Sequence, residues 1–224
     1  MKYVIRFQKT GVICYTSHLD IMKVFKRSFK RAGIRLAYSQ GFNPHPKMGF
    51  AQPLSLGYES LDEYIEFETE DGPGALSAEE ILEKMKQLMP EGLDLLSIEE
   101  AQHPKTLAAN TVAADYTIEI PFSSGLPGDA GAIWHTYMDQ DEIIAWKKQK
   151  KKKDLVPVNI RPKIREILFY PTEEGLRIET TLDSGSDSNL SPELVITTIL
   201  ERFGLEIPRS EIRVTRTKIH FKNN

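Results

Sequence analysis

Residues 61–70 (LDEYIEFETE) alternate between apolar and mostly acidic side chains, and a helix start follows them closely. Ile65 and Phe67 fall on one face of an extended chain and the neighbouring glutamates on the other, which predicts a half-buried strand. In Ser77-Ala-Glu-Glu80, the serine and the last glutamate have the spacing of a capping box. This stretch therefore predicts a strand followed by a helix, as expected in an α+β fold.

The same two periods extend outward from this stretch to cover residues 1–101. Further strands are predicted at residues 2–9 (KYVIRFQK), 34–38 (IRLAY) and 93–100 (LDLLSIEE). A helix is predicted from the cap Ser17 to about Ala32, and Gly33 ends it. The order β-α-β-β-α-β is that of the ferredoxin-like or split βαβ fold, an antiparallel sheet with two helices on one face.

Residues 111–224 repeat this plan with additions. The elements predicted there are strand 111–121, helix 129–138, strand 142–149, a hairpin of strands 165–170 and 175–182, a helix from Ser191 to Phe203, and strand 211–219. Residues 154–164 (DLVPVNIRPKI) are extra to the simple plan, so this half is a decorated copy. We therefore expect tandem ferredoxin-like domains of the α+β class, one over residues 1–101 and one over residues 111–224.

Length and composition fit a globular protein of one large domain or two small ones. The chain has 224 residues, of which 40 % are hydrophobic and 27 % charged. Because no apolar run approaches the roughly 18 residues of a membrane helix, we expect no membrane contact, and the N-terminal residues lack the apolar core of a signal peptide. The single cysteine, Cys14, excludes an internal disulfide framework and favours a reducing cytoplasm.

The net charge of −3 hides three segments of opposite sign. Residues 1–50 hold ten Lys or Arg and one acid, a net charge of +9. Residues 51–110 hold three Lys or Arg and fourteen acids, a net charge of −11. Residues 147–165 hold nine Lys or Arg and one acid, a net charge of +8. Segregated charge of this kind indicates an interaction surface.

The first basic surface is predicted on the helix that follows Ser17. Its five cations lie opposite the apolar positions, and no acid is interleaved with them: Lys23, Lys26, Arg27, Lys30 and Arg31. Cations on a helix are usually a solvated face, but such a face normally contains acids that pair at i,i+4. Their absence favours contact with a polyanion, and we predict that these five residues bind RNA.

The second basic surface is the lysine run 147–153. Counterion release predicts phosphate contacts by Lys147, Lys148, Lys150, Lys151, Lys152 and Lys153. Trp146 before the run, and Arg161 and Arg165 after it, add stacking and guanidinium contacts, a mixture that favours single-stranded or irregular RNA over duplex DNA. The alternative is a mobile, self-repelling loop that has no partner.

Residues 39–50 (SQGFNPHPKMGF) form an aromatic, slightly basic loop. Its prolines exclude a helix interior or a central strand, and they stiffen the chain before binding. We predict that this loop contacts RNA through Asn43, His45 and Lys47. The alternative is a structural crossover loop in which Phe42 and Phe50 plug the core. We expect Phe50 in the core, and His45 and Lys47 outside it.

Two histidines offer an enzymatic alternative. If His18, in the first turn of the basic helix, and His45 shared one groove, they would be acid and base for RNA cleavage through the 2′-hydroxyl. Otherwise His18 is incidental to capping by Ser17 and Asp20. The five histidines show no ligand spacing, so we predict no metal site. Cys14 is interpreted as a small buried hydrophobe in a strand-like VICY segment.

Residues 9–60 contain two distinctive motifs, SHLD at residues 17–20 and SQGFNPHP at residues 39–46. With these motifs as its most specific marks, the stretch resembles the radical SAM-linked family of uncharacterised bacterial proteins. Members of that family occur free or as C-terminal extensions of radical SAM proteins. The resemblance implies a bacterial cytoplasmic protein that works with a radical SAM enzyme. Because this chain has only Cys14, the iron–sulfur cluster and the S-adenosylmethionine would belong to the partner, and we expect no cofactor in this chain.

Three functions follow from these patterns. The first is a non-catalytic RNA-binding accessory protein that presents tRNA or rRNA to a radical SAM modification enzyme. The second is a metal-independent endoribonuclease that uses His18 and His45. The third is a protein-only adaptor for a radical SAM partner. The sequence leaves open whether the chain is an enzyme, although it favours a chain without activity of its own.

Overall fold

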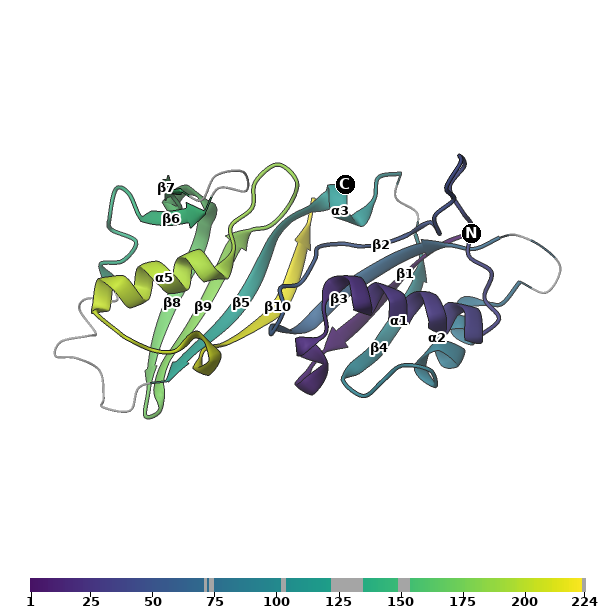
Figure 1. Ribbon diagram of the computed structural model, residues 1–224, viewed down its shortest axis with the longest axis horizontal. Coiled ribbons are helices and arrows are strands. Elements are labelled where there is room, and N and C mark those ends of the chain that lie inside the picture. The colour runs from purple at the N-terminus through teal and green to yellow at the C-terminus, as the bar shows by residue number, and fades with distance from the viewer. Residues whose placement is uncertain (71, 73–74, 102–103, 122–134, 149–153, 223–224) are drawn as a thin grey trace. The chain divides into compact units, whose positions relative to one another are not determined.

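The computed structural model describes residues 1–224 except 71, 73–74, 102–103, 122–134, 149–153 and 223–224 (Figure 1). The chain is of the α+β class and divides into two compact units. Unit 1 comprises Met1–Thr111 with Phe221–Asn224, and unit 2 comprises Val112–His220. In the described part of the chain, no helix is both long and apolar enough to cross a membrane.

Unit 1 has the predicted element order β-α-β-β-α-β. Its elements are β1 (Lys2–Lys9), the 3₁₀ helix η1 (Gly11–Tyr15), α1 (His18–Arg31), β2 (Met48–Phe50), β3 (Glu59–Glu68), α2 (Ala78–Lys86), β4 (Leu93–Glu100) and the short α3 (Leu107–Asn110). Strand β1 pairs with β3 and β4, and β2 pairs with β3, each time antiparallel. The strand order is therefore β4-β1-β3-β2.

One face of this sheet carries the core of unit 1. Apolar side chains of β1, β3 and β4 form one cluster with α1 and α2, so both helices cover the same face (Figure 1). The rings of Phe29 and Phe67 lie 4.5 Å apart between α1 and β3, and those of Phe7 and Phe25 lie 5.1 Å apart between β1 and α1. This packing fixes the rotation of α1 about its own axis.

The strand predicted at residues 34–38 is wrong in extent. Only isolated bridges form there, Leu36 with Thr69 and Tyr38 with Pro46. Instead, β2, at the end of the predicted loop, pairs with β3. An alternating pattern predicts an extended chain. Which residues form a strand with β3 depends on which segment the fold places beside β3.

The VICY segment is also not a strand, because Gly11–Tyr15 form the 3₁₀ helix η1. Cys14 is buried there as predicted. Burial, with a contribution from Glu59, raises the pKa of its thiol. The buried ammonium of Lys9 donates to the carbonyls of Cys14 and Thr16, at 3.1 and 3.0 Å, and fastens η1 to the end of β1.

Unit 2 contains a four-stranded sheet and a separate hairpin. Its elements are β5 (Thr111–Pro121), β6 (Ile144–Lys148), β7 (Leu155–Asn159), the 3₁₀ helix η2 (Arg161–Lys163), β8 (Ile164–Thr172), β9 (Gly175–Asp183), α5 (Pro192–Phe203), the 3₁₀ helix η3 (Arg209–Glu211) and β10 (Arg213–Phe221). The strand order is β10-β5-β9-β8. The segment predicted as extra supplies β7, which pairs with β6 apart from this sheet. Most of the helix predicted at residues 129–138 lies outside the described residues.

The core of unit 2 contains buried side chains of β5 and α5. Tyr116, Ile118 and Ile120 of β5 are buried, as are Val195, Ile196 and Ile199 of α5. The hydroxyls of Tyr137 and Thr198 lie 2.7 Å apart, and the ring of Tyr137 lies 5.6 Å from that of Phe169 on β8. Helix α5 begins at its predicted cap Ser191 and ends at Gly204, whose φ is +62°. These contacts place α5 on the Phe169 side of β8.

Candidate nucleic-acid interface

Helix α1 presents its cations because its two ends and its apolar face are fixed. The side chain of Ser17 accepts from the backbone N–H of Asp20 at 3.2 Å, which caps the first turn. The buried face consists of Ile21, Phe25, Ser28 and Phe29. The opposite positions are all exposed, and they are the five predicted ones: Lys23, Lys26, Arg27, Lys30 and Arg31.

These cations are not equivalent, because one of them is already paired. The Nζ of Lys23 lies 2.9 Å from Oδ1 of Asp20, one turn earlier on the helix. Hydrogen bonds from Ser17 and Lys23 lower the pKa of the Asp20 carboxyl. The other four cations form no ion pair with a carboxylate in the part of the chain that the structure describes: Lys26, Arg27, Lys30 and Arg31. They define a surface that we call the α1 basic face.

The predicted contact loop, residues 39–50, is closed at its base by hydrogen bonds and exposes its predicted contact residues. The backbone N–H of Ser39 donates to the carbonyl of His45 at 2.8 Å, and the N–H of His45 donates to Oγ of Ser39 at 3.0 Å. Asn43, His45 and Lys47 are exposed, as expected. The Nζ of Lys47 lies 2.6 Å from a carboxylate oxygen of Glu68, which compensates its charge.

The two phenylalanines of this loop behave differently. Phe50 packs against the core of unit 1, with its ring 5.7 Å from that of Phe25. Phe42 does not plug the core, because its accessible area is 113 % of the reference value. The crossover-loop interpretation therefore holds for Phe50 alone, and Phe42 is left without a structural role.

The structure places His18 and His45 on different segments of unit 1. The ring of His18, at the start of α1, lies 5.0 Å from that of Phe50, at the end of β2. His45 is exposed in the loop before β2. An acid and a base that act on one phosphodiester must both reach it, and the endoribonuclease stays a prediction.

The predicted RNA contacts of unit 2 are only partly described. Lys147 and Lys148 lie exposed on β6 beside Trp146, which is 51 % exposed. The remaining lysines of the run lie outside the described residues: Lys150, Lys151, Lys152 and Lys153. Arg161 donates to the carbonyl of Met138 through Nε and Nη2, at 3.1 and 2.9 Å.

Arg165 is also engaged within unit 2. Its Nε lies 2.7 Å from Oδ1 of Asp183, and its Nη2 donates to the carbonyl of Val112 at 3.0 Å. Burial opposes ionisation of Asp183, but the hydrogen bonds from Ser188 and Arg165 outweigh it and lower the pKa of that carboxyl. Both predicted arginines therefore already hold protein acceptors.

Four exposed apolar side chains of unit 1 were not predicted from the sequence, and we refer to them together as the apolar end patch. They are Val12, Tyr15, Leu19 and Leu56, which are between 63 % and 86 % exposed. The N–H of Gly57 donates to the carbonyl of Cys14 at 2.9 Å, which joins η1 to the loop that carries Leu56. The alternation in VICY could not reveal this patch, because a 3₁₀ helix turns out side chains that a strand would bury.

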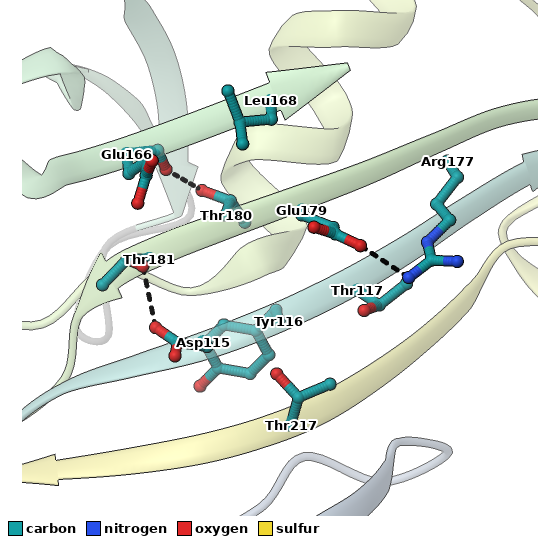
Figure 2. Close-up of a pocket in the computed structure, with 10 residues that line it drawn as sticks. All are labelled: Asp115, Tyr116, Thr117, Glu166, Leu168, Arg177, Glu179, Thr180, Thr181 and Thr217. Carbon is teal, nitrogen blue, oxygen red and sulfur yellow. Dashed lines mark hydrogen bonds and ion pairs between the residues drawn. The ribbon is translucent and has the colours of Figure 1, made fainter. Parts of the chain in front are cut away.

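A pocket of about 360 Å³ in unit 2 was also missed (Figure 2). The hydroxyl of Thr181 donates to Oδ1 of Asp115 at 2.7 Å, and Arg177 donates to Glu179 at 2.5 Å. Nε2 of His220 lies 2.8 Å from the same Asp115 oxygen. With Glu166, the pocket has three carboxylates and one guanidinium, a balance that disfavours a phosphate ligand. Among the described residues, no group of His, Cys, Asp and Glu could hold a metal ion.

Comparisons with known proteins give a family and no activity. The family model described as "Uncharacterized protein conserved in bacteria (DUF2344)" matches residues 2–192. No curated protein matches the chain. A solved structure titled "Crystal Structure of an Unknown Protein from Galdieria sulphuraria" is 14 % identical and covers 96 % of this chain and 97 % of its own. Its TM-score of 0.28 is too low to support any argument.

Proposed function

Because this chain belongs to the family described as "Uncharacterized protein conserved in bacteria (DUF2344)", and that description names no activity, we propose a function from the residues on its own surface. The chain is an RNA-binding accessory protein. The observation that carries this proposal is the α1 basic face. Four exposed cations follow one side of a capped helix, and no described carboxylate pairs with them. Unpaired cations in a row suit the evenly charged backbone of a nucleic acid, and their contacts release counterions.

The test is the salt dependence of binding to bacterial tRNA. The variant is Lys26→Gln with Lys30→Gln, two cations one turn apart on α1. The matched control is Lys84→Gln with Lys86→Gln, two exposed lysines on α2 of the same unit. Each phosphate contact contributes about 0.7 to 0.9 to the slope of log affinity against log salt.

We expect the α1 variant to reduce that slope by about 1.4 to 1.8, while the α2 control leaves it unchanged. Absence of binding at low salt, or equal slopes for both variants, would refute the proposal. The same samples on a denaturing gel should show intact RNA. Cleavage lost on His45→Ala would instead favour the endoribonuclease.

We propose a radical SAM protein as the partner, as the SHLD and SQGFNPHP motifs imply by resemblance. The apolar end patch supports a protein contact, because exposed apolar side chains on a hydrogen-bonded segment are typical of interaction sites. The same patch favours the protein-only adaptor as the second candidate function. Leu19→Asp in the patch should abolish association with a purified radical SAM protein of the same bacterium. Association that survives this change would remove the patch from the proposal.

We also propose that both units are ferredoxin-like domains. The support is a shared strand order: β4-β1-β3-β2 in unit 1 and β10-β5-β9-β8 in unit 2 each place the fourth, first, third and second strands of the plan side by side. In unit 2, β8 holds the place of the second strand, and the β6–β7 hairpin is an insertion. An experimental structure without a helix between β5 and β6 would contradict this assignment.

A further inference from the structure

The tip of the loop in unit 1 carries an aromatic ring that the fold does not use. Phe42 is fully exposed, and Tyr38, at the base of the same loop, is 49 % exposed. Burial of a phenylalanine side chain stabilises a fold, so a ring held in water forgoes that stabilisation. We call residues 38–47 the Phe42 loop.

The base of this loop is fastened on both sides. Tyr38 and Pro46 form a bridge, and the N–H of Lys47 donates to the carbonyl of Ala37 at 2.8 Å. Together with the two hydrogen bonds between Ser39 and His45, these contacts hold the two sides of the loop against each other. The tip between them is short, and Pro44 restricts it further. The ring of Phe42 is therefore presented on a closed loop.

The surroundings of the loop indicate which ligand would cover that ring. Residues 21–58 contain seven Lys or Arg and no Asp or Glu. The loop follows the last turn of α1, where Lys30 and Arg31 belong to the α1 basic face. The acid at its base, Glu68, is paired with Lys47. A ligand that offers negative charge to α1 and a flat apolar face to Phe42 matches both features.

The neighbours of Phe42 distinguish a nucleobase from a lipid. The tip carries Gln40 and Asn43, whose amides can donate to and accept from the edge of a base. A membrane-binding segment would instead gather several large apolar side chains around the ring. Aromatic side chains beside cations are the usual platform for unpaired bases.

We propose that Phe42 is a base-stacking residue and that the site is selective for unpaired RNA over duplex RNA. This inference rests on the proposed function, because the α1 basic face supplies the phosphate contacts. A base in a duplex is stacked between its neighbours and has no free face for the ring. The loop therefore supplies the preference for single strands, while α1 supplies attraction that does not depend on sequence.

The test compares Phe42→Ala, Phe42→Trp and Tyr170→Ala in the full chain. Tyr170 is the control, an exposed aromatic residue on β8. Each variant is titrated with a single-stranded oligoribonucleotide and with its duplex. Phe42→Ala should weaken single-strand binding about 5- to 150-fold, the range for loss of one stacked base, and leave duplex binding and the salt slope unchanged. Phe42→Trp should retain affinity, and its fluorescence should be quenched by the single strand.

Several outcomes would overturn the inference. Unchanged single-strand binding by Phe42→Ala would remove the stacking role, while the loss of salt slope in the α1 variant would still support the proposed function. Equal weakening by Tyr170→Ala would make the effect non-specific. Loss of binding to anionic phospholipid vesicles in Phe42→Ala, with RNA binding retained, would assign the loop to membranes. Conversely, Phe42→Ala could weaken single-strand binding while the α1 variant leaves the salt slope unchanged. That result would retain the stacking role of Phe42 and reject the α1 basic face as the source of the phosphate contacts.

Discussion

The contact between Gly92 and the end of β1 gives a sharp test of the structure. Gly92 directly precedes β4 and has a φ of +83°. A Cβ at this position would lie 2.2 Å from the carbonyl oxygen of Thr10 and 2.9 Å from Cγ2 of Ile13. The N–H of Thr10 in turn donates to the carbonyl of Gly92 at 2.9 Å. Gly92→Ala therefore places a methyl group where a backbone oxygen lies.

Two effects add up in this variant. A left-handed backbone with a side chain costs about 1 to 2 kcal/mol. The overlap involves backbone and cannot be relieved by a rotamer change, so the hydrogen bond between Thr10 and Gly92 has to lengthen, which costs about 0.5 to 1.5 kcal/mol. We expect Gly92→Ala to lower the free energy of unfolding by about 1.5 to 3.5 kcal/mol.

Gly33→Ala is the matched control. Gly33 has a φ of +74°, but nothing lies within 4 Å of the Cβ that it would acquire. This variant should therefore lose only the strain, about 1 to 2 kcal/mol. Urea unfolding of both variants, followed by circular dichroism, measures the difference. If Gly92→Ala is no less stable than Gly33→Ala, the close approach of Gly92 to Thr10 does not exist.

Three further predictions concern the caps and the buried phenols. Ser77→Ala should lower the free energy of unfolding by about 1 kcal/mol, because the capping box with Glu80 is lost; Ser186→Ala, in an exposed loop, should change it by less than about 0.5 kcal/mol. Burial, and then Asp62, raise the pKa of Tyr64 from 10.0 to about 12, so an ultraviolet titration of Asp62→Asn should show a lower pKa that still exceeds 10.0. Burial likewise raises the pKa of Tyr137 to about 12. Between about pH 10 and 12, the folded state therefore keeps both phenols protonated while the unfolded state has lost these protons, so the free energy of unfolding should fall as the pH rises. Urea unfolding measures this fall, which should be less steep in Tyr137→Phe.

Elements with strong local signals could be predicted from the sequence. Ser17, Ser77 and Ser191 cap α1, α2 and α5 as predicted, because capping needs only a hydroxyl a few residues before the N–H that it accepts from. The alternation in β5 and β3 places Ile118 and Ile65 in the two cores. The predictions of a strand at residues 34–38 and of a strand-like VICY segment were wrong for a common reason. Short segments carry the period of a strand without containing the information about which neighbour completes the ladder.

The candidate site likewise has one part that could be predicted from the sequence and another that could not. The rotation of α1, and with it the exposure of its cations, follows from the apolar period of the helix. The pairing of Lys47 with Glu68 and of Arg165 with Asp183 joins residues that are distant in the chain, so no local pattern could predict it. The pocket of Figure 2 is likewise assembled from β5, β8, β9 and β10.

The sequence by itself determined the capped helices, the alternating strands and the side of α1 that is basic, because each depends on interactions between residues a few positions apart. Only the tertiary structure decided that Lys47 and Arg165 pair with carboxylates and that Phe42 projects into solvent. The physical reason is that charge compensation and burial depend on what the folded chain places beside a residue, and those neighbours come from remote parts of the sequence.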